Sequence, residues 1–587
     1  MTTTTTALPA PGKLQLRDYQ RDAISAVRDG FGRGVRRQLI ELPTGTGKTV
    51  VFASIPGRVK KKTLIIAHRS ELLDQARDKL AAANPDLRIE IEQADRHADQ
   101  SADVIIASIQ TLATSPGRLQ AFNPADYSIV VVDEAHHAVA RTYVETFAHF
   151  GLAPDIEGLR DNDLTRREMR ADIKAAFEEF SPAPDTPVLL GVTATSGRTD
   201  GRGLAAMFDE IVFHRTIKDM MLAGWLARVR GLRIGSGVSL EGVKTRAGDF
   251  AERELAEAVN LVERNKLAVS AYQEHATGRQ AIAFAVDVAH ATALCDEFLA
   301  AGIRAATVFG ETPKLQRADT IARYRTGEIN VLVNCMVLTE GFDAPETSCI
   351  VMTRPTKSSL LYTQMLGRGT RLAEGKEDLL ILDIVDIAKA GIASLNTLFG
   401  LPPKFDMTGL GELADVIDAQ RAVEGFNDLP EDVVAEATSV SDLDAAAKEF
   451  DPLAPAVLPD YLRTTMAWYR TPYGYAIQTG DREQVGVVED QLGHATAAFR
   501  GPGQQAIEIG RYASVQGAIE DAEGWIREHR GEQMQLLRAD ARWRKLEPTE
   551  KQLKTARQLK IKVPESATRG IISQLISRKK GERNGDR

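Results

Sequence analysis

The amino-acid sequence predicts an α/β protein with two tandem parallel-sheet domains, followed by small C-terminal α+β and helical modules. In residues 14–225, short β-branched runs alternate with helical patterns, and residues 257–395 repeat this arrangement. Near-continuous apolar strands between helices are typical of a parallel sheet that is covered on both faces. Residues 456–535 differ, because an alternating pattern typical of hairpin strands precedes a stretch with helical spacing.

The two series of apolar runs predict the strands of the two parallel sheets. Each run is short and rich in branched aliphatic residues, and a helical pattern separates it from the next. The expected strands of the first series are QLIEL (38–42), TLIIA (63–67), DVIIAS (103–108), SIVVVD (128–133) and VLLGVT (188–193), and those of the second are QAIAFA (280–285), AATVF (305–309), NVLVN (330–334), SCIVM (348–352) and LLILD (379–383).

The remaining segments differ from these domains in composition. A charged, helix-prone stretch interrupts the first domain and closes on several prolines, which is typical of an insertion. Acidic residues dominate the stretch after the second domain. The predicted segments are a disordered tail at 1–13, a helical insertion at about 152–187, a connector at 226–256, an acidic linker at 396–455 and a basic helical module at 545–587.

The overall composition excludes several classes of protein. With 43% hydrophobic and 26% charged residues among 587, the chain is neither wholly disordered nor fibrous. Its three cysteines form no C-x-x-C pair, which excludes a four-cysteine zinc ribbon and a disulfide scaffold. No long apolar run predicts a membrane span, and the first residues lack the apolar stretch of a signal peptide. We therefore expect a cytoplasmic protein, and a source in a bacterium or a phage is compatible with the sequence.

The net charge of −8 conceals an uneven distribution along the chain. Residues 401–451 contain 13 acidic and 3 basic residues, whereas residues 541–587 contain 14 basic and 5 acidic ones. A basic end on an acidic chain favours contact with a polyanion, or with a protein partner. The alternative is a solvated helical surface without a ligand.

A phosphate-binding loop is predicted between the first strand and the helical pattern that follows it. The sequence LPTGTGKT (42–49) contains small residues that let successive backbone N–H groups point at phosphate oxygens. Lys48 is expected to reach the β and γ phosphates of ATP, and Thr49 to bind Mg²⁺. The predicted binding residues of this loop are Pro43, Thr44, Gly45, Thr46, Gly47, Lys48 and Thr49.

Two carboxylates follow the apolar strand in SIVVVDEAHH (128–137). In an open α/β sheet, ligands bind at the carboxyl ends of the strands. Asp133 is expected to hold Mg²⁺, and Glu134 to polarise the attacking water as a catalytic base. His136 is expected to contact other motifs across the cleft. By itself an acidic pair after a strand also fits a helix cap, but the phosphate loop upstream favours catalysis.

A pair of arginines in QMLGRGTR (364–371) completes the predicted catalytic set. We expect this segment to open a helix, so that Arg368 and Arg371 project from one helical face. Two guanidinium groups on one face suit a γ-phosphate during transfer. With Gln364, they belong to the second domain, so the nucleotide is expected to lie between the two domains. The alternative is an ordinary surface pair.

The ordered set of motifs resembles superfamily 2 helicases and translocases of the DEAD/DEAH type. In motif wording it is most similar to the RadD-like and XPB-like DNA helicases, through AHRSELLDQ (67–75), DEAHH, LTEGFDAP (338–345) and the TDGRGL…GWLA stretch (199–227). The other matching strings are LRDYQ (16–20), SIQTL (108–112), VTATSGR (192–198), AIAFAVDVAHA (281–291) and QMLGRGTR. The resemblance implies two RecA-like domains with ATP and Mg²⁺ as cofactors.

The resemblance also implies roles for residues outside the phosphate loop. Gln20 would read adenine with support from Arg17, Thr193 and Thr195 would couple hydrolysis to the strand, and Gly341 and Asp343 would link nucleotide to DNA. DNA is the expected partner, bound without regard to its sequence. The implied DNA contacts, or their supports, are His68, Arg69, Ser108, Gln110, Thr111, Thr339 and Glu340.

Several alternatives remain at this point. The chain could be the motor of a restriction or nuclease system, an ATP-gated clamp that binds DNA without unwinding it, or an enzyme acting on RNA. The aromatic residues Trp468, Tyr469, Tyr473 and Tyr475 could stack on bases or fill the core of a small domain. The segment 547–580 could dock DNA or a partner, or pack as an amphipathic helical hairpin.

Overall fold

The computed structural model divides the chain into two compact units, residues 1–420 and 421–587, which are described separately below. None of the helices in the described part has the length and apolar character needed to cross a lipid bilayer. Most of the expected insertion at 152–187 lies outside the described residues. The described residues are 16–68, 70–155, 176–177, 180–194, 204–246, 248–335, 344–387, 393–399, 401–402, 405, 413–424, 434, 437–443, 462–471, 474–480, 483–490, 492–501, 506–531, 537–538, 541–559, 561, 567–573 and 576.

The first lobe is built on a sheet whose described strands run in the order β3-β4-β2-β5-β6-β1-β7. Every neighbouring pair is parallel, so the carboxyl ends of all these strands lie along one edge. The five predicted strands are present, and β3 and β7 are additional edge strands with fewer buried residues. The strands are β1 (Arg37–Glu41), β2 (Lys62–Ala67), β3 (Ile89–Glu92), β4 (Val104–Ser108), β5 (Tyr127–Asp133), β6 (Val188–Thr193) and β7 (Glu210–His214).

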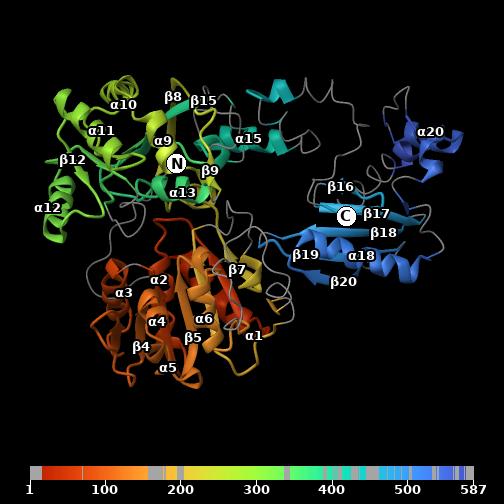
Figure 1. Ribbon diagram of the computed structural model, residues 1–587, viewed down its shortest axis with the longest axis horizontal. Coiled ribbons are helices and arrows are strands. Elements are labelled where there is room, and N and C mark those ends of the chain that lie inside the picture. The colour runs from red at the N-terminus through yellow and green to blue at the C-terminus, as the bar shows by residue number, and fades with distance from the viewer. Residues whose placement is uncertain are drawn as a thin grey trace, which may run out of the picture. The chain divides into compact units, whose positions relative to one another are not determined.

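Helices surround this sheet, as the red-to-orange part of Figure 1 shows. The apolar strands at its centre are fully buried, which places the core of the lobe between sheet and helices. The helices are α1 (Asp18–Gly32), α2 (Lys48–Ala53), α3 (Ser70–Ala83), α4 (Ile109–Thr114), α5 (Pro116–Gln120), α6 (Arg141–His149) and α8 (Ile217–Leu222), with short 3₁₀ turns η1 (Pro56–Arg58), η2 (Pro124–Asp126), η3 (Ala135–His137) and η4 (Leu204–Ala206).

The second lobe has a sheet with the described strand order β12-β13-β11-β14-β15-β8, again parallel throughout. Strand β8 lies in the segment 226–256 that we predict to be a connector, and it pairs with β15 along most of its length. Because β8 is an edge strand with alternating exposure, it lacks the continuous apolar run of the central strands. The strands are β8 (Arg228–Ser239), β11 (Ala281–Phe284), β12 (Ala305–Val308), β13 (Val331–Asn334), β14 (Cys349–Met352) and β15 (Asp378–Ile387).

Helices α10 and α11 pack on this sheet and close its main core, which includes Tyr272, Leu294 and Phe298. The short hairpin of β9 (Thr245–Arg246) and β10 (Asp249–Phe250) follows β8. The helices of this part are α9 (Glu252–Val259), α10 (Val262–His275), α11 (Val288–Ala300), α12 (Lys314–Arg325), α13 (Ser359–Leu366), α14 (Leu395–Leu398) and α15 (Leu413–Glu424).

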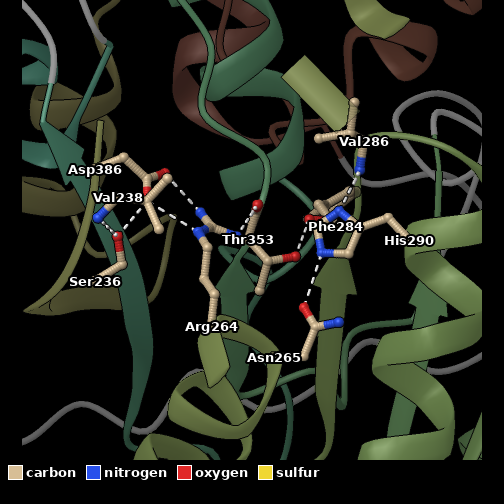
Figure 2. A network of polar contacts seen from close by, with 9 residues as sticks. All are labelled: Ser236, Val238, Arg264, Asn265, Phe284, Val286, His290, Thr353 and Asp386. Carbon is tan, nitrogen blue, oxygen red and sulfur yellow. Dashed lines mark hydrogen bonds and ion pairs between the residues drawn. The ribbon is translucent and has the colours of Figure 1, made fainter. Parts of the chain in front are cut away.

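A buried polar network joins the elements of the second lobe (Figure 2). Arg264 on α10 forms a two-point ion pair with Asp386 on β15, at 2.9 and 2.7 Å, and donates to the Thr353 carbonyl at 2.9 Å. On α11, Nδ1 of His290 accepts from the Val286 N–H at 3.2 Å. Because buried polar groups are costly unless paired, these contacts specify how the helices sit on the sheet.

The C-terminal unit contains an antiparallel sheet of β16 (Tyr469–Thr471), β17 (Gly474–Gly480), β18 (Glu483–Glu489), β19 (Ala495–Arg500) and β20 (Ile507–Tyr512). Helix α18 (Val515–His529) packs on one face of it, and Trp468 and Tyr475 belong to this core. Nε1 of Trp468 donates to Glu523 at 3.1 Å, and Tyr469 is buried as well. Trp468 and Tyr475 therefore fill this core, Tyr469 is buried nearby in sequence, and Tyr473 lies outside the described residues.

A separate small cluster follows in the C-terminal unit. Ala556 on α20 (Glu550–Gln558) packs with Ala567, Ile572 and Ile576, and the short turn η6 (Arg542–Lys545) precedes the helix. The predicted fold class is thus confirmed: two parallel-sheet α/β lobes are followed by small α+β and helical modules.

Candidate active site

The predicted phosphate loop connects the carboxyl end of β1 to the start of α2. Gly45 and Gly47 have φ angles of 88° and 81°, in the left-handed region that glycine adopts without steric cost. A Cβ atom on Gly47 would lie only 2.9 Å from Nε2 of Gln20. Within the loop, the Thr46 hydroxyl donates to the Pro43 carbonyl at 2.7 Å. The loop therefore closes with Pro43-Thr44 at its start, although the general phosphate-loop pattern G-x-x-x-x-G-K-[ST] has a glycine near that point.

Two buried groups of opposite charge meet beside this loop. Nζ of Lys48 lies 3.8 Å from Oε1 of Glu134, and both side chains are largely buried. Among the described residues, neither Nζ of Lys48 nor Oε2 of Glu134 has a hydrogen-bond partner. A buried ammonium without a hydrogen-bond acceptor fits a phosphate. The residues present therefore fit the predicted nucleotide.

Glu134 is also unusual in its backbone. Its φ and ψ of 50° and 54° place a non-glycine residue in the left-handed region, a conformation that costs about 1–3 kcal/mol. Burial favours a raised pKa for the Glu134 carboxyl, but the charges of Lys48, His136, Arg368 and His137 together lower the pKa. The structure thus holds an ionised carboxylate in an inward-facing position, which suits a base.

Asp133 and Thr49 are the predicted magnesium ligands. Asp133 is the last residue of β5, and its Oδ1 accepts from the Glu134 N–H at 3.0 Å. The described residues contain no group of three or more His, Cys, Asp or Glu side chains placed to hold a metal ion. Because Mg²⁺ commonly takes one or two protein ligands and completes its shell with phosphates and water, a single carboxylate such as Asp133 suits a substrate-dependent site.

A chain of polar and ring contacts leads from Glu134 to the predicted DNA-facing residues. Nδ1 of His136 lies 3.4 Å from Oε2 of Glu134, and the His136 and His137 rings are 4.1 Å apart. The His137 ring stacks on His68 at 5.1 Å, and Nδ1 of His68 is 3.3 Å from Nε2 of Gln110. His68 and Gln110 are exposed. The Glu134 carboxylate is therefore connected to the surface through side chains.

The other described residues of the implied DNA set are turned toward the protein. Ser108 is buried and donates to Oε1 of Gln110 at 2.7 Å. Thr111 is also buried and accepts from the Ala94 N–H at 3.0 Å. Thr193 places its hydroxyl 3.5 Å from Nδ1 of His136. Ser108 and Thr111 thus form hydrogen bonds inside the protein, to Gln110 and to the Ala94 backbone.

The arginine-containing segment differs from its predicted structure. Helix α13 ends at Leu366, and Arg368 and Arg371 lie in the turn that follows, so the prediction of one shared helical face is wrong. Glycines 367 and 369 explain the ending, since glycine is a poor helix former. Gly369 is closely packed, because a Cβ atom added to it would lie 2.3 Å from Cδ1 of Leu379 and would clash.

This turn packs directly against the phosphate loop. A Cβ on Gly367 would lie 2.5 Å from Cβ of Thr44, and a Cβ on Gly45 would lie 3.3 Å from Cγ of Arg371. Arg368 is buried, and its charge helps to lower the pKa of Glu134. Gln364 is buried as well, with Nε2 lacking a hydrogen-bond partner among the described residues. The structure brings the two predicted halves of the catalytic set together.

The predicted adenine-reading residues hold the phosphate loop from the other side. Nε2 of Gln20 donates to the Thr46 carbonyl at 3.2 Å, and its Oε1 accepts from the Arg17 N–H at 2.9 Å. Two residues that the motif reading missed lie here: the Tyr19 hydroxyl also donates to the Thr46 carbonyl, and Trp225 lies under the Arg17 guanidinium at 4.9 Å. The sequence offered a signal for both residues, because Tyr19 lies within the LRDYQ string and Trp225 within the GWLA string.

Five predicted site residues cannot be placed. They are Arg69, Thr339, Glu340, Gly341 and Asp343, which lie outside the described residues, as does Thr195.

Family models match three parts of the chain. The model "Type III restriction enzyme, res subunit" matches residues 13–198, and "Helicase conserved C-terminal domain" matches residues 263–373. The model "Mitochondrial helicase Irc3, C-terminal domain" matches residues 461–586. The first two each lie within one parallel-sheet lobe, and the third spans both C-terminal modules.

Individual relatives match the same region. The chain is 34% identical over 400 residues to "Putative ATP-dependent helicase IRC3" of Saccharomyces cerevisiae, covering 66% of this chain and 54% of that protein. It is 26% identical to the type I restriction enzyme EcoKI endonuclease subunit of Escherichia coli, covering 65% and 35%. It is 24% identical to DNA 3'-5' translocase XPB2 of Sulfurisphaera tokodaii, covering 64% and 83%. The chain thus spans about half the length of the yeast relative.

Proposed function

Since this chain belongs to superfamily 2 of the helicases, we propose that it is an ATP-dependent DNA helicase or translocase of repair, recombination or replication. The packing of the second lobe's arginine turn on the first lobe's phosphate loop is the observation that carries this proposal. Gly367 meets Thr44 and Arg371 meets Gly45 across the two lobes. A nucleotide bound there would contact both lobes, which a motor requires.

Each lobe contributes different groups to ATP hydrolysis. Lys48 binds the β and γ phosphates, and Glu134, whose pKa the surrounding positive charges lower, accepts a proton from the attacking water. Thr49 and Asp133 would hold Mg²⁺, and the bound ion would supply positive charge to neutralise the phosphates. Arg368 and Arg371 stabilise the charge that develops on the transferred phosphoryl group.

ATP hydrolysis is coupled to movement through the closure of the two lobes. ATP contributes contacts to Lys48 on one lobe and to Arg371 on the other, so it favours the closed arrangement. ADP lacks the γ-phosphate and favours opening. DNA lies across both lobes and is held mainly by its phosphates, through His68 and Gln110 among the described residues, so that its sequence is not read.

DNA-stimulated ATPase activity is the first test of this proposal. We expect single-stranded or branched DNA to stimulate ATP turnover, and RNA to stimulate it much less when the two compete. A strand-displacement assay beside a triplex-displacement assay then separates a helicase from a translocase that does not unwind. An absence of nucleic-acid-stimulated turnover would refute the motor function.

A motor in a restriction or nuclease system is a second candidate function. It is favoured by the restriction-enzyme family model on the first lobe and by the EcoKI relative. Incubation of the protein with plasmid DNA, ATP and Mg²⁺ separates the two functions, because a nuclease linearises or nicks the plasmid and a helicase leaves it intact. An ATP-gated clamp would bind branched DNA and show neither displacement activity.

The basic C-terminal module supplies a docking surface for DNA or a protein partner. On α20, Lys551, Lys554 and Arg557 are exposed, whereas Ala556 is buried in the small apolar cluster. The basic side chains thus lie on the solvent side of a packed helix. Replacing all three with glutamate should weaken DNA binding and reduce its salt dependence if DNA is the ligand. Unchanged DNA binding would favour a protein partner.

A further inference from the structure

Lys376 makes an unusual set of hydrogen bonds in the second lobe. Its Nζ donates to the carbonyl oxygens of Pro345 at 3.1 Å, Arg371 at 2.8 Å and Gly369. An ammonium group has three N–H donors, and here three backbone carbonyls take them. Pro345 ends the LTEGFDAP string, whereas Gly369 and Arg371 belong to the arginine turn, so one side chain connects two motifs that are distant in sequence.

The local sequence explains how Lys376 reaches these carbonyls. The turn Ala373–Lys376 is closed by a hydrogen bond from the Lys376 N–H to the Ala373 carbonyl at 3.2 Å. Gly375 occupies the left-handed region with a φ of 74°, which reverses the chain just before β15 begins at Asp378. This reversal brings the lysine side chain back beneath the arginine turn that precedes it.

The bonded carbonyls lie next to the contact between the lobes. A Cβ atom added to Gly45 of the phosphate loop would lie 3.3 Å from Cγ of Arg371. It would lie equally far, 3.3 Å, from the hydroxyl oxygen of Thr370. The Thr370 carbonyl accepts from the Ala227 N–H at 2.7 Å. The backbone of the arginine turn is therefore held by donors from two directions, and Lys376 supplies the side-chain donor.

We propose that Lys376 is a positioning residue for ATP hydrolysis, which holds the arginine turn against the phosphate loop and ties it to the LTEGFDAP segment. This inference rests on the proposed function, because it assigns to Lys376 the placement of Arg371 for phosphoryl transfer. The ammonium acts through backbone carbonyls and does not touch the nucleotide. Loss of one N–H would release one of the three carbonyls and loosen the turn.

The charge state of Lys376 gives this arrangement a pH dependence. Burial, together with the charges of Arg371 and Arg279, lowers the pKa of the Lys376 ammonium to about 8, against the opposite effect of Glu346 and Asp378. The folded-state pKa lies below the ordinary 10.5, so the unfolded chain holds this proton over the window from about 8 to 10.5. Raising the pH through that window therefore increases the contribution of Lys376 to the free energy of unfolding. It also removes one of the three N–H groups that bind the carbonyls.

The test uses the full-length protein with ATP, Mg²⁺ and a saturating DNA strand. We expect Lys376→Met to lower kcat by about 10- to 100-fold while KM for ATP changes by less than about threefold, since misplacement of about 1 Å costs that much. Lys376→Arg keeps the charge but has a planar fork that cannot supply three convergent donors, so it should restore kcat only in part. Lys244→Met is the matched control, because Lys244 pairs with Glu254 on the surface of the same lobe.

The pH profile provides a readout that a purely structural role would not move. Wild-type kcat should fall with an apparent pKa near 8, and this alkaline limb should be absent from Lys376→Arg, whose guanidinium does not titrate. Circular dichroism across the same pH range should show that the wild-type fold is intact. If Lys376→Met does not fold, the comparison of wild type with Lys376→Arg still decides the question.

Failure of the proposed function and failure of the role of Lys376 give different experimental results. Wild-type protein without DNA-stimulated turnover would overturn the proposed function, and with it this inference. Active wild-type protein with an unchanged kcat in Lys376→Met, or with the same alkaline limb in Lys376→Arg, would overturn the role of Lys376 alone.

Discussion

Nζ of Lys48 lies 3.8 Å from Oε1 of Glu134, in a site where both side chains are largely buried. The two residues come from different strand ends, since Lys48 begins α2 after β1 and Glu134 follows β5. The cation lowers the pKa of a carboxyl that burial would otherwise raise. Lys48 therefore favours the charged form of Glu134, which makes the pair a sensitive target for mutation.

Lys48→Ala should abolish ATP turnover, because it removes the phosphate ligand and leaves Glu134 with less compensating charge. Glu134→Gln should keep nucleotide binding and lower kcat by about 10²- to 10⁴-fold, since it removes only the base. Binding of a fluorescent ATP analogue and steady-state phosphate release measure the two effects. Lys62→Ala, at the start of β2, is a control that should retain activity. DNA-stimulated turnover by Lys48→Ala would contradict the assignment.

Arg371→Ala should leave nucleotide binding largely intact and lower kcat by about 10³-fold or more, as expected for an arginine that stabilises a transferring phosphoryl group. The side chain lies beside Gly45 of the phosphate loop. Arg304→Ala is the matched control in the same lobe, since Arg304 pairs with Asn330 on the surface. Equilibrium ATP binding and single-turnover hydrolysis separate the two effects. A collapse of ATP affinity in Arg371→Ala would mean that its role is misassigned.

His137→Ala should reduce the ratio of DNA-stimulated to unstimulated ATPase activity by about fivefold or more, a typical size for coupling between two sites. Its ring lies between His68, near the exposed Gln110, and His136, which contacts Glu134. The measurement is the ATPase rate with and without saturating DNA. His149→Ala serves as the control, because His149 bonds to the Phe122 carbonyl elsewhere in the lobe. Equal ratios in both variants would argue against coupling through these rings.

The second lobe should lose stability as the pH falls below neutrality, because His290 is buried as the neutral imidazole (Figure 2). Burial, with a contribution from Arg264, lowers the pKa of His290 to about 3 from 6.5. Between these values the unfolded chain binds the proton that the folded chain does not, so acid favours unfolding by about 2 kcal/mol at pH 5.

Urea denaturation at pH 7 and pH 5, followed by circular dichroism, measures this effect. His290→Gln should be less stable than wild type at pH 7, because it disturbs the bonds to Val286 and Asn265. It should nevertheless show a smaller loss between the two pH values. An equal loss in wild type and variant would exclude His290 as the titrating group.

Much of the fold follows from the local sequence pattern. Most central strands of both sheets contain near-continuous apolar runs because they are buried on both faces, and this pattern is visible without a structure. Among the edge strands of the two parallel sheets, β12 is predicted from its run of residues, whereas β3, β7 and β8 have a mixed composition that does not separate them from loops. Partial burial of an edge strand depends on its neighbours and cannot be read from its own residues.

The sequence by itself determined the chemical identity of the site: a glycine-rich loop with Lys48, a carboxylate pair after β5 and an arginine segment, in the order typical of superfamily 2 helicases. Only the tertiary structure decided how these groups meet. It ended α13 at Leu366, placed Arg371 beside Gly45 and brought Lys376 onto three carbonyls. Arg371 and Gly45 are far apart in the chain and lie in different lobes, so their contact depends on packing that no local pattern encodes.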